Sequence, residues 1–289
     1  MDDSADRHPL RLPFRAPFAG DTLLSFLGAR ALRGVEEVDD GTYRRSVRLL
    51  DGSAAVIRLM PDIVAGHVAL NSPEDDALVQ SARRAFDLDA DPHASDAKLA
   101  DDPKLEPLVT RIPGLRVPGT FDGFELVVRA IFGQQVSVAG ARTSLGRLVE
   151  RFGTPLDPPS GGITHLFPSP EQVAELPPEA FGMPRARAET IRRVADLVAR
   201  GELDLSGDTE PGEALHTLGE LPGIGPWTLA YVAMRALRDP DAFMVGDLGV
   251  RKGFEALGLP STSKELLARA ERWRPWRAYA VMHLWNAHP

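Results

Sequence analysis

A turn rich in glycine and proline lies between two apolar segments, at residues 221–230. Gly223 and Gly225 free the backbone for a tight hairpin, and Pro226 suits the first turn of a following helix. Backbone N–H groups then gather at the positive N-terminus of that helix, where they can bind phosphate without a charged side chain. A turn of this kind also serves simply as a connection, so a binding site needs further residues.

An acidic residue follows at a spacing that can return it to the hairpin. Asp247 comes twenty-two residues after Gly225, and the helix expected at 227–238 spans about three turns. The short loop after this helix allows Asp247 to lie beside the helix start. Asp247 also suits the N-cap of a helix at 248–256. The two roles are compatible, because a capping carboxylate held by N–H groups can still face a cationic substrate.

The hairpin and Asp247 together resemble the signature of the helix-hairpin-helix DNA glycosylase superfamily, and within it the AlkA-type DNA-3-methyladenine glycosylases (type II). The resemblance extends over nearly the whole chain. Besides the hairpin, the segments that carry it are Phe26-Leu27-Gly28-Ala29-Arg30-Ala31, residues 124–138, Phe181-Gly182-Met183-Pro184 and Ala270-Glu271-Arg272-Trp273-Arg274-Pro275-Trp276-Arg277.

This resemblance implies a reaction and a site. Such an enzyme flips the target nucleotide out of the duplex and hydrolyses the N-glycosidic bond of an N3- or N7-methylated purine. Asp247 is the implied catalytic residue, which stabilises the positive charge that grows on the sugar; whether it also activates water is left open. The implied base pocket, whose π-faces favour a cationic base, consists of Trp227, Tyr231, Trp285 and Phe26. The alternative for each ring is ordinary core packing.

The resemblance also implies DNA contacts around the hairpin, through Gly223, Ile224, Gly225 and Thr228. Gln135 takes the position from which relatives insert a plug into the gap left by the flipped base. Because Gln135 is polar where the best-known relative has a large apolar side chain, its action as a plug stays open; the alternative is an exposed residue at a helix start. The implied ligands of a structural monovalent cation, sodium, are the backbone carbonyls of Gly219, Leu221 and Ile224. No cofactor is required.

Two absences refine the expected activity. Superfamily members that also cut the strand carry a lysine after the hairpin, which forms a Schiff base, and this chain has Trp227 there. We therefore expect a monofunctional enzyme that uses water as nucleophile and has no lyase step. The chain contains no cysteine, which excludes disulfides, thiol catalysis and a cysteine-held iron–sulfur cluster.

A hypothesis of a different class is a non-catalytic helix-hairpin-helix module that only binds DNA. Asp247 and the aromatic set favour the enzyme, since phosphate binding needs neither. The expected partner is double-stranded DNA with alkylated bases, and the expected protein is a monomer in the cytoplasm, associated with the nucleoid. The exact lesion range, the regulation and the role of the N-terminal domain do not follow from the sequence.

Charge and hydropathy are consistent with this picture. The formal charge of −8 argues against a nucleic-acid partner when taken alone. The acidity is concentrated at 74–106, however, and residues 251–289 are basic, so a positive face is possible. The longest apolar runs are far shorter than the ~20 residues of a membrane span, and the acidic N-terminus lacks the pattern of a secretion signal.

The predicted fold class is α+β, with a small N-terminal antiparallel sheet and helices, followed by an all-helical helix-hairpin-helix glycosylase core in two lobes. Alternating apolar residues predict three strands, with Asp-Gly turns between them, and the segment 155–170 is expected to be a loop. The expected domains are an N-terminal α+β domain at 1–97, a helical domain with the hairpin at 121–239, and a second lobe, completing a DNA cleft, at 98–120 and 240–289.

Overall fold

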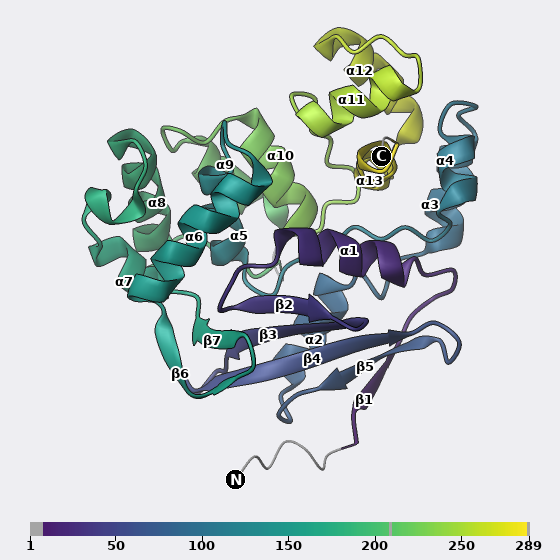
Figure 1. The fold of residues 1–289 in the computed structure, drawn as a ribbon. Helices are drawn as coiled ribbons and strands as arrows, with labels where there is room; N and C mark the ends of the chain where they lie inside the picture. The colour runs from purple at the N-terminus through teal and green to yellow at the C-terminus, as the bar shows by residue number, and fades with distance from the viewer. Residues whose placement is uncertain (1–7, 208–209, 288–289) are drawn as a thin grey trace.

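The computed structural model describes residues 8–207 and 210–287. Its N-terminal part is an antiparallel sheet of five strands in the order β1-β5-β4-β3-β2, and α1 lies between this sheet and the helices beyond it (Figure 1). The elements are β1 Leu10–Pro13, α1 Gly20–Arg30, β2 Glu36–Asp39, β3 Thr42–Arg48, β4 Ala54–Asp62, β5 His67–Asn71 and α2 Asp76–Ala85.

Alternation of apolar side chains explains this sheet. Tyr43 on β3 pairs in register with Leu59 on β4, and Leu59 with Leu70 on β5, and all three side chains are buried. Apolar residues of α1 and α2 complete the same core cluster. The sequence predicted three strands, and this number was wrong. The additional strands, β1 and β5, pair with each other, which is a contact between distant segments that local patterning does not show.

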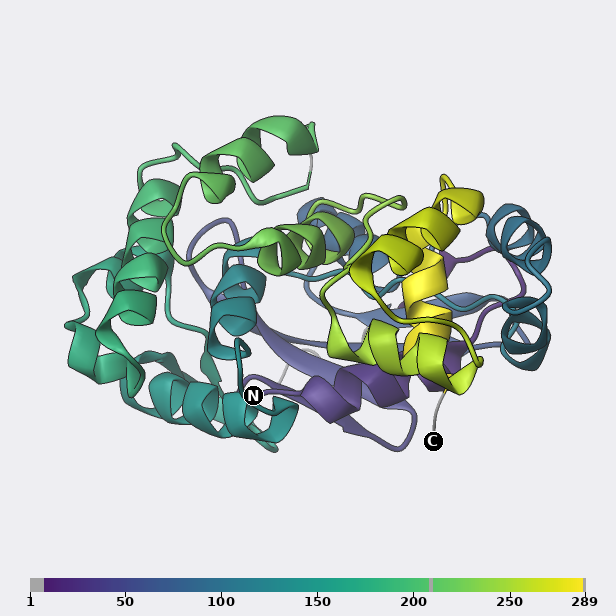
Figure 2. The same ribbon diagram turned by 90° about the horizontal axis from the view of Figure 1, so that it is seen from above.

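The remaining helices form two groups above the sheet (Figures 1 and 2). The first group contains α5 Gly123–Phe132, α6 Val138–Phe152, α7 Pro170–Glu175, α8 Arg185–Ala199, α9 Pro211–Gly219 and α10 Pro226–Arg235. The second contains α3 Pro92–Ala100, α4 Glu106–Arg111, α11 Leu248–Ala256, α12 Ser263–Ala270 and α13 Arg277–Trp285. Short 3-10 helices lie at Pro178–Phe181 and Glu271–Trp273. The α+β class and the helical core are confirmed, whereas the domain boundaries stay a prediction.

The segment expected to be a loop contains a second, two-stranded sheet. Strands β6 Thr154–Ser160 and β7 Ile163–Leu166 pair with each other, and the pairing is irregular between Pro155 and Ser160. Proline offers no N–H to a neighbouring strand, so a proline-rich strand survives only at an edge or a bulge. The loop prediction was wrong because these prolines masked the strand.

Buried charges join the sheet to the helical core. Glu36 on β2 contacts Arg129 on α5, while Arg45 on β3 lies 2.8 Å from Glu125 on α5 and 3.3 Å from Glu36. Burial raises the pKa of Glu36, but the guanidinium groups of Arg129 and Arg45 outweigh this effect and bring the pKa down to about 2. This network fixes α5, and therefore the loop after α5, against the sheet. Within the described residues, no helix is long and apolar enough to cross a membrane.

Candidate active site

The hairpin connects α9 to α10 as predicted, but its two glycines serve different purposes. Gly223 has a φ of +92°, and a Cβ there would lie 2.6 Å from the hydroxyl of Thr190. Gly225 has an ordinary φ of −99°, and a Cβ there would meet open space. Backbone conformation therefore requires glycine only at Gly223. Gly225 keeps the surface beside the start of α10 clear, and no side chain caps that helix start.

Neighbouring helices hold the hairpin in place. The Thr190 hydroxyl on α8 donates to the carbonyl of Pro222 at 2.7 Å, and the Gln134 amide donates to the carbonyl of Gly223 at 3.0 Å. The same amide donates to the Thr228 hydroxyl at 3.2 Å. Thr228 is only 2% exposed. Its side chain therefore fixes the hairpin, and a contact with DNA is left to its backbone.

Asp247 lies where three N–H donors converge. Asp247 is the N-cap of α11, and its Oδ1 accepts two hydrogen bonds, from the backbone N–H of Val250 at 2.8 Å and from Trp285 Nε1 at 2.8 Å. Its Oδ2 accepts a third from Trp227 Nε1 at 2.9 Å. These residues come from α10, α11 and α13, so the fold brings together three segments that are separate in the sequence. The carboxylate is partly buried and lies directly between the two indoles.

The four predicted aromatic residues form two stacked pairs beside this carboxylate. Trp227 and Tyr231 stack with ring centroids 5.2 Å apart and an interplanar angle of 9°. Phe26 of α1 and Trp285 of α13 stack at 5.9 Å and 14°. All four side chains are partly buried. Because each tryptophan also donates to Asp247, the rings and the carboxylate form one cluster, which we call the aromatic site.

Gly249 makes room for Trp285, a role that the sequence did not suggest. A Cβ at Gly249 would lie 2.6 Å from Trp285 Cδ1, 2.8 Å from its Nε1 and 3.0 Å from Asp247 Oδ1. The missing side chain therefore lets the indole approach the first turn of α11 and reach the carboxylate. A glycine inside a predicted helix is a weak signal, since it is unfavourable there relative to alanine.

Two arginines also belong to the aromatic site and were not predicted. Arg30 lies one helical turn after Phe26 on α1, and Arg235 lies one turn after Tyr231 on α10. Arg235 donates to the Tyr231 hydroxyl at 2.6 Å. Although burial raises it, the charges of Arg235 and Arg30 lower the pKa of Tyr231 below its usual value. The spacing of four residues between ring and arginine is the only local signal that could have suggested these pairs.

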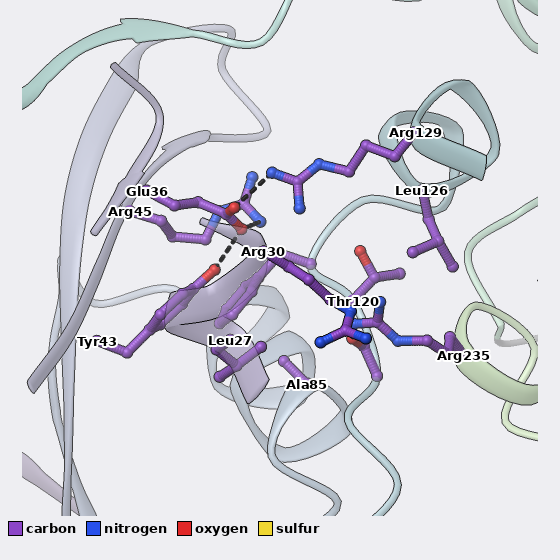
Figure 3. Close-up of a pocket in the computed structure, with 12 residues that line it drawn as sticks. Leu27, Arg30, Glu36, Tyr43, Arg45, Ala85, Thr120, Leu126, Arg129 and Arg235 are labelled. Atoms are coloured by element: carbon purple, nitrogen blue, oxygen red, sulfur yellow. Dashed lines mark hydrogen bonds and ion pairs between the residues drawn. The ribbon is translucent and has the colours of Figure 1, made fainter. Parts of the chain in front are cut away.

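A cavity lies between the sheet and the helices, and two of its lining residues, Arg30 and Arg235, contact the aromatic site (Figure 3). It has about 380 Å³ of space between atoms, part of which is open to solvent, and Arg30 and Arg235 form part of its wall. Residues of the sheet, α1, α2, α5 and the loop before α5 line the rest, among them Glu36, Tyr43 and Thr120. The lining includes neither Asp247 nor the four aromatic residues. Arg30 and Arg235 are therefore the residues that the cavity wall and the aromatic site have in common.

Gln135 lies in the loop between α5 and α6. Its side chain is exposed, and its φ of +60° is unusual for a residue with a Cβ. The two residues that frame the next helix start, Val136 and Val138, are 47% and 49% exposed. The preceding Gln134 binds the hairpin, so the loop tip with Gln135 is held near the start of α10.

The carbonyls predicted to bind a cation lie at the end of α9 and in the turn. Gly219 is the last residue of α9, where helix carbonyls lack partners within the helix and the dipole favours positive charge. The carbonyl of Leu221 accepts the N–H of Ile224 at 3.1 Å, which leaves one lone pair for a second partner. Ile224 itself has a buried side chain. The described residues contain no cluster of histidine, aspartate or glutamate suited to a metal.

The fold and the site together define a helix-hairpin-helix protein with a carboxylate beside the hairpin helix. The profile of the AlkA N-terminal domain matches residues 9–122, and that of the HhH-GPD superfamily of base excision DNA repair proteins matches residues 128–278. The chain belongs to the HhH-GPD superfamily, and its resemblance to the AlkA-type proteins is confirmed.

Named relatives agree with this assignment. The chain is 44% identical to a probable bifunctional transcriptional activator/DNA repair enzyme AlkA of Mycobacterium tuberculosis, over 99% of this chain and 58% of the relative. It therefore spans little more than half the length of that relative. It is 35% identical to DNA-3-methyladenine glycosylase 2 of Escherichia coli, over 95% of both chains. A solved 3-methyladenine DNA-glycosylase from Archaeoglobus fulgidus has the same fold, with a TM-score of 0.82, 24% identity, and coverage of 96% of this chain and 97% of the other.

Proposed function

We propose that the protein is a monofunctional DNA glycosylase of base excision repair, which acts on N3- and N7-methylated purines in double-stranded DNA. The observation that carries this proposal is the position of Asp247. Capping α11 needs neither indole, and phosphate binding at the hairpin needs no carboxylate, so the carboxylate held between two indoles supports catalysis over DNA binding alone. The names of the relatives support the same activity.

The residues support a simple sequence of events. The free N–H groups at the start of α10 hold a DNA phosphate, and the flipped base enters the aromatic site. As the bond from the purine nitrogen to C1′ breaks, its electron pair leaves with the base, and the Asp247 carboxylate stabilises the positive sugar. The oxygen of a water molecule then bonds to C1′ and releases a proton. Where a lyase would have an amine, Trp227 donates to Asp247.

Accessory roles follow from the same geometry. The hairpin carbonyls at the end of α9 fit a monovalent cation such as sodium, which would neutralise part of the phosphate charge; we propose no other cofactor. We also propose that Gln135, which is exposed in the loop between α5 and α6, fills the gap that the flipped base leaves opposite the orphan base. We expect Gln135→Ala to weaken binding to lesion DNA but not to undamaged DNA, and equal affinities of variant and parent for lesion DNA would exclude a plug. We further propose that the protein acts as a monomer on the nucleoid in the cytoplasm.

Incubation of the purified protein with methylated duplex DNA tests the proposal. We expect chromatography to show released 3-methyladenine and 7-methylguanine, with strand breaks only after heat or alkali. Binding of DNA without base release would favour the non-catalytic module. Nicking without heat, or a covalent complex trapped by borohydride, would show a lyase step and contradict the monofunctional mechanism.

A further inference from the structure

The aromatic site already contains positive charge. The guanidinium carbon of Arg30 lies 3.7 Å from the centroid of the Phe26 ring and 5.8 Å from that of Trp285. The guanidinium carbon of Arg235 lies 5.0 Å from the Phe26 ring and 5.4 Å from the Tyr231 ring. Both distances to Phe26 are within the range of cation–π attraction. The faces that would attract a cationic base are thus shared with two resident cations.

The two arginines are held very differently. Arg235 is 6% exposed and donates to three groups, the carbonyls of Pro118 at 2.7 Å and Gly119 at 2.9 Å and the hydroxyl of Tyr231. Arg235 is therefore a fixed structural cation. Arg30 is partly exposed, and its bond to the carbonyl of Phe26 is long, at 3.4 Å. Its head group also forms a hydrogen bond with Tyr231, but it has no bond to a main-chain carbonyl as short as the two of Arg235.

The charged groups of the aromatic site affect a cationic base and a neutral base differently. Asp247 supplies one negative charge, and Arg30 and Arg235 supply two positive charges. A base that carries a positive charge is attracted by the rings and by Asp247 but repelled by both guanidinium groups. A neutral base escapes this repulsion, and its ring nitrogens and carbonyl oxygens can accept hydrogen bonds from Arg30, whose guanidinium is a donor only.

We propose that Arg30 is a specificity-determining residue, which shifts the balance of excision from cationic towards neutral purines. The inference rests on the proposed glycosylase function. Burial and the charge of Arg235 lower the pKa of Arg30, Tyr231 and Asp247 oppose this shift, and an arginine stays protonated at neutral pH in any case. The positive charge is therefore permanent, and only removal of the side chain can abolish it.

Arg30→Met tests this role, because methionine keeps an unbranched apolar stem on Phe26 without the charge. Single-turnover rates are measured for release of 3-methyladenine, which is cationic in DNA, and of hypoxanthine, which is neutral. Removing one cation within several ångströms of the base is expected to raise the ratio of these rates about tenfold or more. Arg30→Lys, which keeps the charge, is expected to leave the ratio within about threefold of the parent.

Arg33→Met is the matched control, since Arg33 lies just beyond α1, is exposed and carries the same charge. It tests whether loss of general attraction for DNA changes the ratio, and no change is expected. If the parent releases too little hypoxanthine to measure, only the rate of 3-methyladenine release is compared. The proposal then requires Arg30→Met to release 3-methyladenine faster than the parent.

A ratio in Arg30→Met within about twofold of the parent would overturn the proposal, and so would a fall in the ratio or an equal change in Arg33→Met. These outcomes differ from failure of the proposed function, in which the parent protein releases neither base. A thermal unfolding curve for each variant separates a lost fold from an altered preference. If Arg30→Met does not fold, Arg30→Gln, which also removes the charge, supplies the readout with the same expected and contradicting outcomes.

Discussion

The exchange Asp247→Asn tests the catalytic role, but the structure shows that it is not a silent change. Oδ1 of Asp247 accepts from Val250 and Trp285, and Oδ2 accepts from Trp227. Asparagine has one oxygen and one NH₂ group, so one indole N–H must face another donor. A lost hydrogen bond to a charged acceptor costs about 1.5–3 kcal/mol. We therefore expect Asp247→Asn to lower the free energy of unfolding by about 2 kcal/mol.

The expected loss of activity is larger than the loss of stability. A sugar cation about 4 Å from the carboxylate gains about 4 kcal/mol at an effective dielectric constant near 20. This free energy corresponds to a factor of about a thousand in rate. Single-turnover release of 3-methyladenine by Asp247→Asn should fall by about that factor, whereas urea unfolding should show a protein that is still folded.

A second substitution separates the two effects. Trp227→Phe removes the indole N–H and keeps an aromatic ring. In the double variant Trp227→Phe/Asp247→Asn, the asparagine NH₂ group therefore no longer faces the indole N–H of residue 227. We expect it to be more stable than Asp247→Asn, with no recovery of base release. If Asp247→Asn releases 3-methyladenine within about tenfold of the parent rate, the electrostatic argument is refuted. A double variant less stable than Asp247→Asn would refute the donor conflict.

Three further changes have definite expected outcomes. Gly249→Ala should push the Trp285 indole away from Asp247 and slow base release about tenfold or more. The control Gly246→Ala, whose added Cβ would meet nothing within 4 Å, should release base at the parent rate. Equal rates for Gly249→Ala and the parent would contradict the role of Gly249. Burial raises the pKa of Asp87 to about 6, so the folded state binds its proton more tightly and the parent should lose about 3 kcal/mol of stability as the pH rises from about 4 to above 6. Asp87→Asn should flatten this part of the urea-unfolding profile, and a persistent slope would contradict the assignment. Burial, with the charge of a nearby arginine, lowers the pKa of His283 to about 4, so stability should fall by about 3 kcal/mol as the pH drops from about 6.5 to 4. Neither ring nitrogen of His283 has a hydrogen-bond partner among the described residues. His283→Leu should therefore remove this fall in stability and stabilise the protein at pH 5. A variant less stable than the parent at pH 5 would contradict this prediction.

The features that the sequence predicted correctly are those fixed by local chemistry. Gly223 needs a positive φ, Pro226 begins α10, and Asp247 caps α11, and each of these follows from a few adjacent residues. That Trp227 and Tyr231 share one helix face follows from their spacing, and the structure adds that the two rings stack. The α+β class follows from the change between alternating and helical apolar patterns along the chain.

The features that were missed depend on contacts between distant segments. Nothing near Gly249 in the sequence shows that Trp285 packs against it, because the two residues come from different helices. The sequence did not single out Arg30 or Arg235 as site residues, and only the fold places both beside Phe26. The sequence predicted that the ring faces bind a cationic base. Only the tertiary structure shows that two cations of the protein, Arg30 and Arg235, already lie against these rings.

The donors around Asp247 explain how a carboxylate can be fixed and still act on a substrate. Two indole N–H groups and one backbone N–H hold its oxygens, and all three donors are neutral. Among the described residues Asp247 makes no ion pair, so in the proposed reaction no directly contacting cation cancels its field at the sugar. An arginine in place of either indole would orient the carboxylate equally well but would neutralise it. For the proposed reaction the tryptophans therefore combine two properties: they position the negative charge without an ion pair, and they offer apolar faces to the proposed base.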